Sequence, residues 1–93
     1  MIKGDCYALE VQGDSMVEDG ILNGDYVIIK SQKDASNGET VVANVDGSAT
    51  IKRLEKKKSK ILLHPANPNY NAIEVEKGNF DIEGILIGLI RRY

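Results

Sequence analysis

One serine and one lysine carry the catalytic potential of this 93-residue sequence. Ser15 lies in the stretch Gln12-Gly13-Asp14-Ser15-Met16, where an extended segment gives way to a turn. A sharp turn would expose the hydroxyl and direct nearby backbone N–H groups toward one point, as an acyl-transfer nucleophile with an oxyanion hole requires. A local alternative stays open, because the segment from Ser15 to Glu18 fits the S-x-x-E capping box, in which Ser15 would only cap a helical turn.

Lys52 is the matching candidate for a general base. It shares one face of an extended segment with Ser48, Thr50 and Leu54. A base must be neutral, and a free lysine titrates near ~10.4, so the pKa would have to fall to about 7–8, which full desolvation can achieve. Thr50, two residues earlier on that face, could orient the amine, and a Ser–Lys dyad needs no histidine. The alternative is a solvated lysine whose stem lies along the surface.

Other catalytic and metal-binding patterns are missing from the sequence. The single histidine, His64, follows a strand candidate beside a proline and is expected in a surface loop. The single cysteine, Cys6, is expected to be a small, partly buried apolar residue. Asp14, Asp19 and Asp25 do not have the spacing of a calcium loop and fit turn and cap positions. We therefore expect no metal and no cofactor.

Composition indicates a single globular domain over residues 1–93, with 42% hydrophobic and 28% charged residues. Twelve Lys+Arg against fourteen Asp+Glu give a net charge of −2, which argues against binding nucleic acid by phosphate neutralisation. The only basic run, at residues 56–60, is expected to be a solvated hairpin tip. No apolar run approaches the ~18 residues of a membrane span, and no signal peptide is recognisable. A cytoplasmic location fits best.

Extended segments separated by turn signals dominate the chain, so we expect a mainly β domain of small, coiled sheets. Asp46-Gly47 is a strong two-residue hairpin signal, and Met16 to Asp19 could form one helical turn closed by Gly20. The run from Tyr26 to Ile29 is apolar throughout and predicts a strand covered on both faces. The expected strands cover residues 7–12, 26–29, 40–45, 48–54, 60–63, 73–75 and 80–90.

The last strand candidate is apolar on both faces, which leaves two interpretations open. One is burial of both faces within the domain. The other is self-association through this strand, because an unpaired apolar edge invites pairing and a small domain has few elements left to cover it. The residues concerned are Ile85, Leu86, Ile87, Leu89 and Ile90.

Several segments together resemble the LexA-type self-cleaving repressors. The resemblance to that family's serine box lies in residues 13–16, 19–21 and 23–27, and residues 37–43 and 49–54 resemble the segment ending in its lysine box. Residues 65–70 and 82–88 resemble the family's later loop and last strand. The match covers nearly the whole chain in order, and the separation of Ser15 from Lys52 also fits.

The resemblance implies a fold, an activity and partners. The fold would be the LexA/signal-peptidase-like β fold, and the full protein a repressor of DNA-damage (SOS) genes whose N-terminal winged helix-turn-helix binds operator DNA. The C-terminal domain would form a homodimer through the last strand and contain a latent peptidase. Stimulated by the RecA filament on single-stranded DNA, it would cut its own chain at an Ala-Gly-type bond.

Individual roles follow from the same resemblance. Ser15 would be the nucleophile, Lys52 the general base and Thr50 the residue that orients the lysine. The backbone N–H groups of Ser15 and Asp14 would form the oxyanion hole, and Met16 would neighbour the cleft.

The sequence also departs from the family. It contains no Ala-Gly or Cys-Gly pair and begins fourteen residues before Ser15, so we expect it to lack the cleavage segment and the DNA-binding domain. Ser48 stands where LexA proteins often carry an acidic residue. A UmuD-type polymerase accessory subunit and a phage-type repressor association domain share the serine and lysine boxes and remain alternatives, although the tight loop over residues 15–25 favours LexA. A membrane signal peptidase would need an anchor and motifs not found here.

Overall fold

Seven strands and one short helix make up the chain in the computed structural model, which describes residues 5–76 and 78–92. The expectation of a mainly β fold is confirmed, since the only helix among the described residues is a single turn of 3-10 helix. In chain order the elements are β1 (Cys6–Glu10), η1 (Val17–Asp19), β2 (Tyr26–Ser31), β3 (Thr40–Val45), β4 (Ser48–Lys56), β5 (Ile61–His64), β6 (Ile73–Val75) and β7 (Phe80–Ile90).

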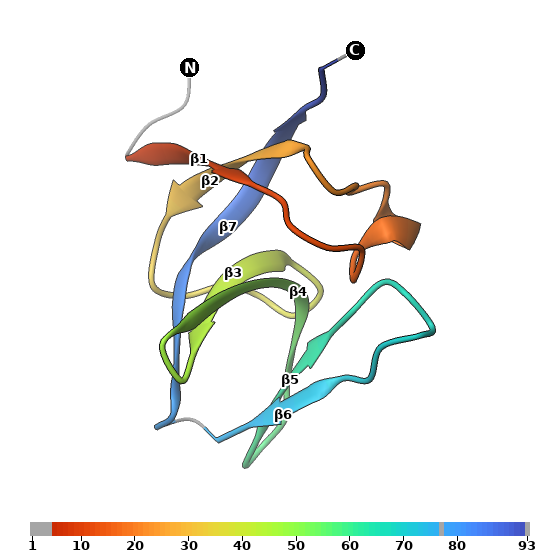
Figure 1. The fold of residues 1–93 in the computed structure, drawn as a ribbon. Helices are drawn as coiled ribbons and strands as arrows, with labels where there is room; N and C mark the ends of the chain where they lie inside the picture. Colours follow the sequence, from red (N-terminus) through yellow and green to blue (C-terminus); the bar gives the residue numbers. More distant parts are fainter. Residues whose placement is uncertain (1–4, 77, 93) are drawn as a thin grey trace.

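The strands form one antiparallel sheet in the order β1-β2-β7-β3-β4-β5-β6, and the long strand β7 joins its two halves (Figure 1). Residues 80–85 of β7 pair with β3, and residues 84–90 pair with β2. At the crossover Gly84 is required, because a Cβ there would collide with the carbonyl oxygen of Lys30 on β2. β7 is therefore an interior strand of the sheet, although residues 86–90 pair with β2 alone.

Two hydrophobic cores correspond to the two halves. The first lies under β3 to β7 and includes Val41, Leu54 and Leu63, all at most 1% exposed. The second packs β1 and β2 against the segment around η1. Because side chains alternate along β3, Val41 enters the first core and Val42 the second, so β3 separates and connects them. The loop that contains Ser15 therefore packs in the second core, together with β1 and β2.

The tight turns follow the sequence signals. Asp46 (φ 52°) and Gly47 (φ 86°) both adopt left-handed backbone conformations between β3 and β4, as a two-residue hairpin of type I′ requires. Gly20, at φ 77°, ends η1 and returns its N–H to the carbonyl of Val17. The predicted hairpin and the predicted helical turn are both confirmed.

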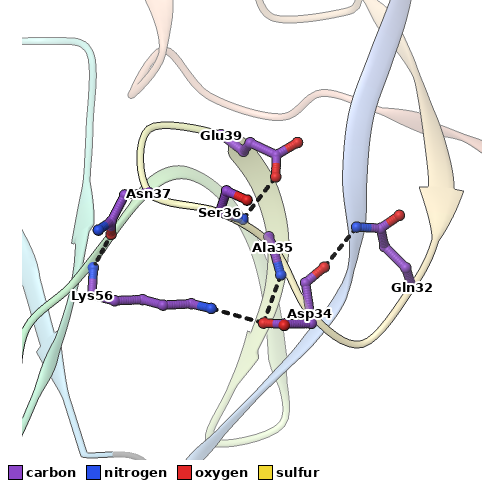
Figure 2. Close-up of polar contacts among 7 residues, drawn as sticks. All are labelled: Gln32, Asp34, Ala35, Ser36, Asn37, Glu39 and Lys56. Atoms are coloured by element: carbon purple, nitrogen blue, oxygen red, sulfur yellow. Dashed lines mark hydrogen bonds and ion pairs between the residues drawn. The ribbon is translucent and has the colours of Figure 1, made fainter.

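The connection from β2 to β3 is fastened to the end of β4 by side-chain hydrogen bonds (Figure 2). The ammonium of Lys56 contacts Asp34 Oδ1 at 2.8 Å, and the backbone N–H of Lys56 donates to Asn37 Oδ1. Glu39 Oε1 accepts the backbone N–H of Ser36 at 2.7 Å. This connection therefore fixes the far end of β4, the strand that also carries Lys52.

Three expectations need correction. The face of β2 that carries Tyr26 and Ile28 is only partly covered, because Tyr26 is 43% exposed and Ile28 is half-buried. Cys6 is exposed rather than partly buried. His64 ends β5 and lies half-buried beside Glu55 instead of occupying a loop. The basic run is a solvated hairpin tip as expected, with residues 56–58 exposed. Within the described ranges no helix is long and apolar enough to span a membrane.

Candidate active site

The Ser15 turn belongs to a loop over residues 11–25 that returns on itself. The two ends of the loop are joined by backbone hydrogen bonds. The N–H of Val11 donates to the carbonyl of Asp25 at 2.8 Å, and the carbonyl of Val11 accepts the N–H of Gly24 at 2.9 Å. Met16 and Ile21, 3% and 5% exposed, anchor the loop in the second core. Ser15 is half-buried and lies between the hydrogen-bonded Val11 and the anchored Met16, so the chain is held before and after it.

Lys52 lies on β4 with its amine directed at Ser15. Its Nζ is 3.0 Å from Ser15 Oγ, 2.7 Å from Thr50 Oγ1 and 3.0 Å from the carbonyl oxygen of Ile51. The residue is 7% exposed, and no carboxylate of the described residues lies within ion-pair distance of it. Burial without a counter-ion penalises the ammonium and lowers the pKa of Lys52.

The three contacts match the hydrogen-bonding capacity of a neutral amine. A neutral amine has two N–H donors and one lone pair. The carbonyl of Ile51 can only accept and Thr50 Oγ1 can accept, so they can take both donors. The lone pair is then left for the hydroxyl proton of Ser15. In the charged form all three N–H bonds would donate and Ser15 could not be activated.

The alternative in which Ser15 caps a helix is not what the structure contains. η1 begins after Met16, and no side chain makes a capping hydrogen bond at its first turn. The Ser15 hydroxyl contacts Lys52 instead. The alternative of a solvated Lys52 is likewise excluded by its burial.

The backbone around Ser15 also offers free donors. Among the described residues, no acceptor takes the backbone N–H of Asp14 or of Ser15. Gly13, at φ 92°, turns the chain just before them, and its own N–H donates to Asn23 Oδ1. Two unused, adjacent N–H groups beside a hydroxyl are what an oxyanion hole needs.

Two cavities meet at Ser15 and Lys52. The first, of about 240 Å³, is mostly apolar and is lined by Leu9, Glu10, Val11, Gln12, Gly13, Ser15, Met16, Ile21, Val42, Ala49, Thr50, Ile51 and Lys52. The second, of about 280 Å³, lies toward the β5–β6 loop and is lined by Gln12, Gly13, Asp14, Ser15, Lys52, Tyr70, Asn71 and Ile73. A hydroxyl at such a junction can reach a chain that occupies both hollows.

Sequence reasoning missed the residues that support this turn from the β5–β6 loop. The side chain of Asn67, 8% exposed, donates to the carbonyl of Asp14 at 2.9 Å, and the Tyr70 hydroxyl donates to Asp14 Oδ1 at 2.6 Å. Asn67 Oδ1 also accepts the N–H of Asn69, an Asx turn that the composition of residues 65–70 could have indicated. In Figure 1 this loop reaches back toward η1.

A second buried charge near the loop was also missed. Asp25, 3% exposed, accepts two hydrogen bonds from the Arg91 guanidinium, at 2.9 and 2.8 Å, and one from the N–H of Leu22. These bonds lower the pKa of Asp25 to about 2. Arg91 also donates to the carbonyl of Gly20, so the residue after β7 holds the end of the Ser15 loop. Within the described part of the chain, no group of three or more metal-ligating side chains is present.

An antiparallel β domain with a serine turn facing a buried lysine is consistent with a family of peptidases. Residues 1–87 match the Peptidase S24-like family model, and the chain belongs to this family.

Proteins similar to this chain include LexA repressors, as the sequence resemblance predicted. The chain is 50% identical over 91 residues to the LexA repressor of Syntrophotalea carbinolica, with 97% of this chain and 45% of that protein covered. It is 53% identical over 87 residues to LexA repressor 1 of Xanthomonas campestris pv. campestris, covering 92% and 43%. LexA repressor 2 of Pseudomonas putida is 49% identical over 87 residues, also covering 92% and 43%. The chain thus spans less than half the length of these relatives.

Proposed function

We propose that this chain is the catalytic and dimerisation domain of a LexA-type SOS repressor, a serine endopeptidase that cuts the repressor's own chain. The observation that carries the proposal is the 3.0 Å contact between Ser15 Oγ and the amine of Lys52. That amine is buried, and no described carboxylate lies within ion-pair distance of it. A structural lysine would be exposed or paired, whereas this one is kept in an environment that favours its neutral form.

The chemistry follows from the donors and acceptors around Ser15. Lys52 accepts the hydroxyl proton while Ser15 Oγ bonds to the scissile carbonyl carbon. The carbonyl oxygen becomes an oxyanion held by the N–H groups of Ser15 and Asp14. The Lys52 ammonium then gives its proton to the leaving nitrogen as the C–N bond breaks, which leaves an acyl-serine. Lys52 next deprotonates a water that attacks this ester, and it returns the proton to Ser15 Oγ as the acyl C–Oγ bond breaks, which restores the serine hydroxyl. Thr50 Oγ1 and the carbonyl of Ile51 orient the amine throughout.

The wider biological role extends the proposal to partners. The RecA filament would stimulate cleavage, and operator DNA would bind through an N-terminal domain of the longer protein. The names of the three relatives favour a LexA parent over a UmuD-type subunit or a phage-type repressor.

Mutation and pH together test the dyad. With a peptide containing an Ala-Gly bond, or a longer chain bearing the cleavage segment, cleavage should rise with alkaline pH as Lys52 deprotonates. Ser15→Ala and Lys52→Ala should each reduce the rate by at least ~10³-fold. Ser59→Ala and Lys58→Ala, both at the exposed hairpin tip, serve as matched controls and should cleave like the parent. Persisting cleavage in Ser15→Ala or Lys52→Ala would refute the dyad.

Dimerisation through β7 is the second part of the proposal. Ile87, Leu89 and Ile90 are 39%, 38% and 57% exposed in the single chain, and residues 86–90 pair with β2 on one side only. Apolar side chains beside an open strand edge favour association. Sedimentation at micromolar concentration should give a dimer, Ile90→Glu should give a monomer, and Val17→Glu, at an equally apolar exposed position, should remain dimeric. A monomeric parent would contradict this part of the proposal.

A further inference from the structure

Three polar or charged residues are buried among the described residues, and the proposed chemistry explains one of them. They are Lys52, Asp25 and Asn67. Lys52 is the base, and Asp25 is neutralised by Arg91. Asn67, 8% exposed, lies in the loop between β5 and β6 and contacts neither the Ser15 hydroxyl nor the Lys52 amine. Burying an amide is costly unless its donors and acceptors are used, so its partners indicate its role.

The partners of Asn67 lie on the backbone of the Ser15 turn and within its own loop. Its Nδ2 donates to the carbonyl of Asp14 at 2.9 Å, while its Oδ1 accepts the N–H of Asn69 at 2.9 Å. The second bond sets the side chain in one orientation, and the first uses that orientation to hold the Asp14 carbonyl, which also accepts the longer hydrogen bond from the N–H of Val17 at 3.3 Å. The amide therefore connects a rigid loop to the peptide unit that precedes Ser15.

The neighbours of Asn67 fix the following peptide units as well. The N–H of Ala66 donates to the carbonyl of Ser15 at 2.8 Å, and the carbonyl of Ala66 accepts the N–H of Glu18 at 2.8 Å. Two consecutive carbonyls, those of Asp14 and Ser15, are thus both anchored on the same side by the β5–β6 loop. The backbone of the turn cannot rotate without breaking these bonds.

The geometry of the peptide bond converts this anchoring into a direction. The carbonyl of Asp14 and the N–H of Ser15 belong to one planar, trans peptide unit, so they point in opposite directions. Because the carbonyl of Asp14 faces Asn67, the Ser15 N–H points away from the β5–β6 loop. On that other side no acceptor among the described residues takes it. A donor bound to the carbonyl also polarises the unit and strengthens the N–H as a donor.

We infer that Asn67 is a positioning residue for the oxyanion hole: its side-chain amide sets the direction and strength of the Ser15 N–H. The inference rests on the proposed function, since it concerns the donor that stabilises the oxyanion of that reaction. Asn67 acts through the backbone and touches neither the substrate nor the Lys52 amine. It should therefore affect the rate of the chemical step, but neither substrate affinity nor the pKa of the base.

The decisive variants are Asn67→Ala and Asn67→Asp. Alanine removes the donor. Aspartate keeps the size of the side chain and the acceptor for Asn69, but sets a carboxylate oxygen against the Asp14 carbonyl. With the Ala-Gly peptide as substrate, both should lower kcat by about 10- to 100-fold, at or below the loss caused by removing an oxyanion donor outright. KM should stay unchanged in both variants, and the pH midpoint of kcat should stay unchanged in Asn67→Ala, with the aspartate variant the slower of the two.

Asn69→Ala is the matched control. Asn69 is an exposed residue of the same loop, and only its backbone N–H bonds to Asn67, so this variant should have parental kcat. If thermal melting shows that Asn67→Ala does not fold, the kcat of Asn67→Asp alone tests the inference. Parental kcat in a folded Asn67 variant, or an effect confined to KM, overturns the inference while leaving the dyad intact. A shifted pH midpoint in Asn67→Ala, which adds no charge, also overturns it, because Asn67 would then act on Lys52. Cleavage that survives Ser15→Ala would instead refute the proposed function itself.

Discussion

Asp25 and Lys52, the two charged residues that are buried in the described part of the chain, differ in their surroundings. Asp25, 3% exposed, receives two hydrogen bonds from the Arg91 guanidinium and one from the N–H of Leu22. Lys52, 7% exposed, contacts only oxygens without formal charge, on Ser15, Thr50 and Ile51. The difference between the two sites is the presence of a counter-ion rather than the degree of burial.

Both pKa values are lowered, but the consequences differ in sign. For Asp25 the Arg91 hydrogen bonds lower the pKa to about 2, which favours the charged carboxylate and makes the pair a structural tie. For Lys52 desolvation lowers the pKa, which favours the neutral amine that the proposed base requires. Asp25, paired with Arg91, holds the loop in place. Lys52, which lacks a counter-ion among the described residues, favours the neutral form that can accept the proton of Ser15.

Lys52→Met tests this contrast with the largest expected effect. Cleavage should fall by at least ~10³-fold because the base is lost. Between the lowered folded pKa and the ordinary 10.5 the unfolded chain binds more protons than the folded one, so stability should rise with pH through that range. Methionine removes this penalty, so its Tm at pH 7 should exceed the parent's, and the difference should shrink at alkaline pH. A lower Tm than the parent's, in thermal melts from pH 6 to 10, would contradict a destabilising lysine.

Thr50→Asp gives Lys52 the counter-ion that Asp25 already has. The carboxylate would lie within reach of an amine now 2.7 Å from Thr50 Oγ1, and it should raise the pKa of Lys52. The rate at pH 7 should fall about tenfold for each unit of that rise, with the pH profile displaced to higher pH. Thr50→Val is the control, because it removes the hydrogen bond without adding charge and should lower the rate without an alkaline displacement. Coincident pH profiles for the parent and the aspartate variant would show that charge does not control the base.

Asp25→Asn removes the charge from the paired site. The Arg91 guanidinium then lacks its carboxylate, so the Tm at pH 7 should fall. The folded pKa of about 2 lies below the ordinary 3.8, so the stabilisation is complete above pH 4 and is lost as the pH falls through 2. The gap between parent and variant should accordingly close in acid, measured by urea unfolding from pH 7 to 2. A constant gap would mean that ionisation of Asp25 does not stabilise the fold.

Arg53→Gln should have the smallest effect, because its ion pair is exposed. The guanidinium contacts both carboxylate oxygens of Asp19, at 2.8 and 2.7 Å, but the Arg53 side chain is 51% exposed. Exposed pairs contribute roughly 0.5 kcal/mol, so the change in free energy of unfolding should be of that order and should diminish in high salt. A loss as large as that in Asp25→Asn would show that burial does not distinguish these pairs.

Much of the fold was predictable because it is encoded locally. The spans of β3, β6 and β7 agree with residues 40–45, 73–75 and 80–90, and the Asp46-Gly47 hairpin agrees in position and backbone conformation. Alternation, turn residues and glycines act over two to six positions, so they are visible in the sequence. The central position of β7 was not visible, because pairing partners are chosen by distant segments.

The candidate site divides in the same way. Ser15, Thr50 and Lys52 could be singled out by residue type, turn context and resemblance to LexA-type repressors, and their roles remain proposals. The supporting roles of Asn67 and Arg91 could not be predicted in this way, because they depend on contacts between residues 53 and 66 positions apart in the chain. An amide or a guanidinium in a sequence has no distinguishing mark until a partner is folded against it.

The sequence alone therefore determined the elements and the residue types: short strands, two-residue turns, a serine at a bend and a lysine on a strand. Only the tertiary structure decided their chemistry. Folding brings β4 against the Ser15 turn and removes water from Lys52, and among the described residues no carboxylate pairs with its amine. Asp25 is also buried, but folding places the Arg91 guanidinium beside it. The state of a buried charge depends on which groups surround it in space, and that arrangement exists only once both cores have formed.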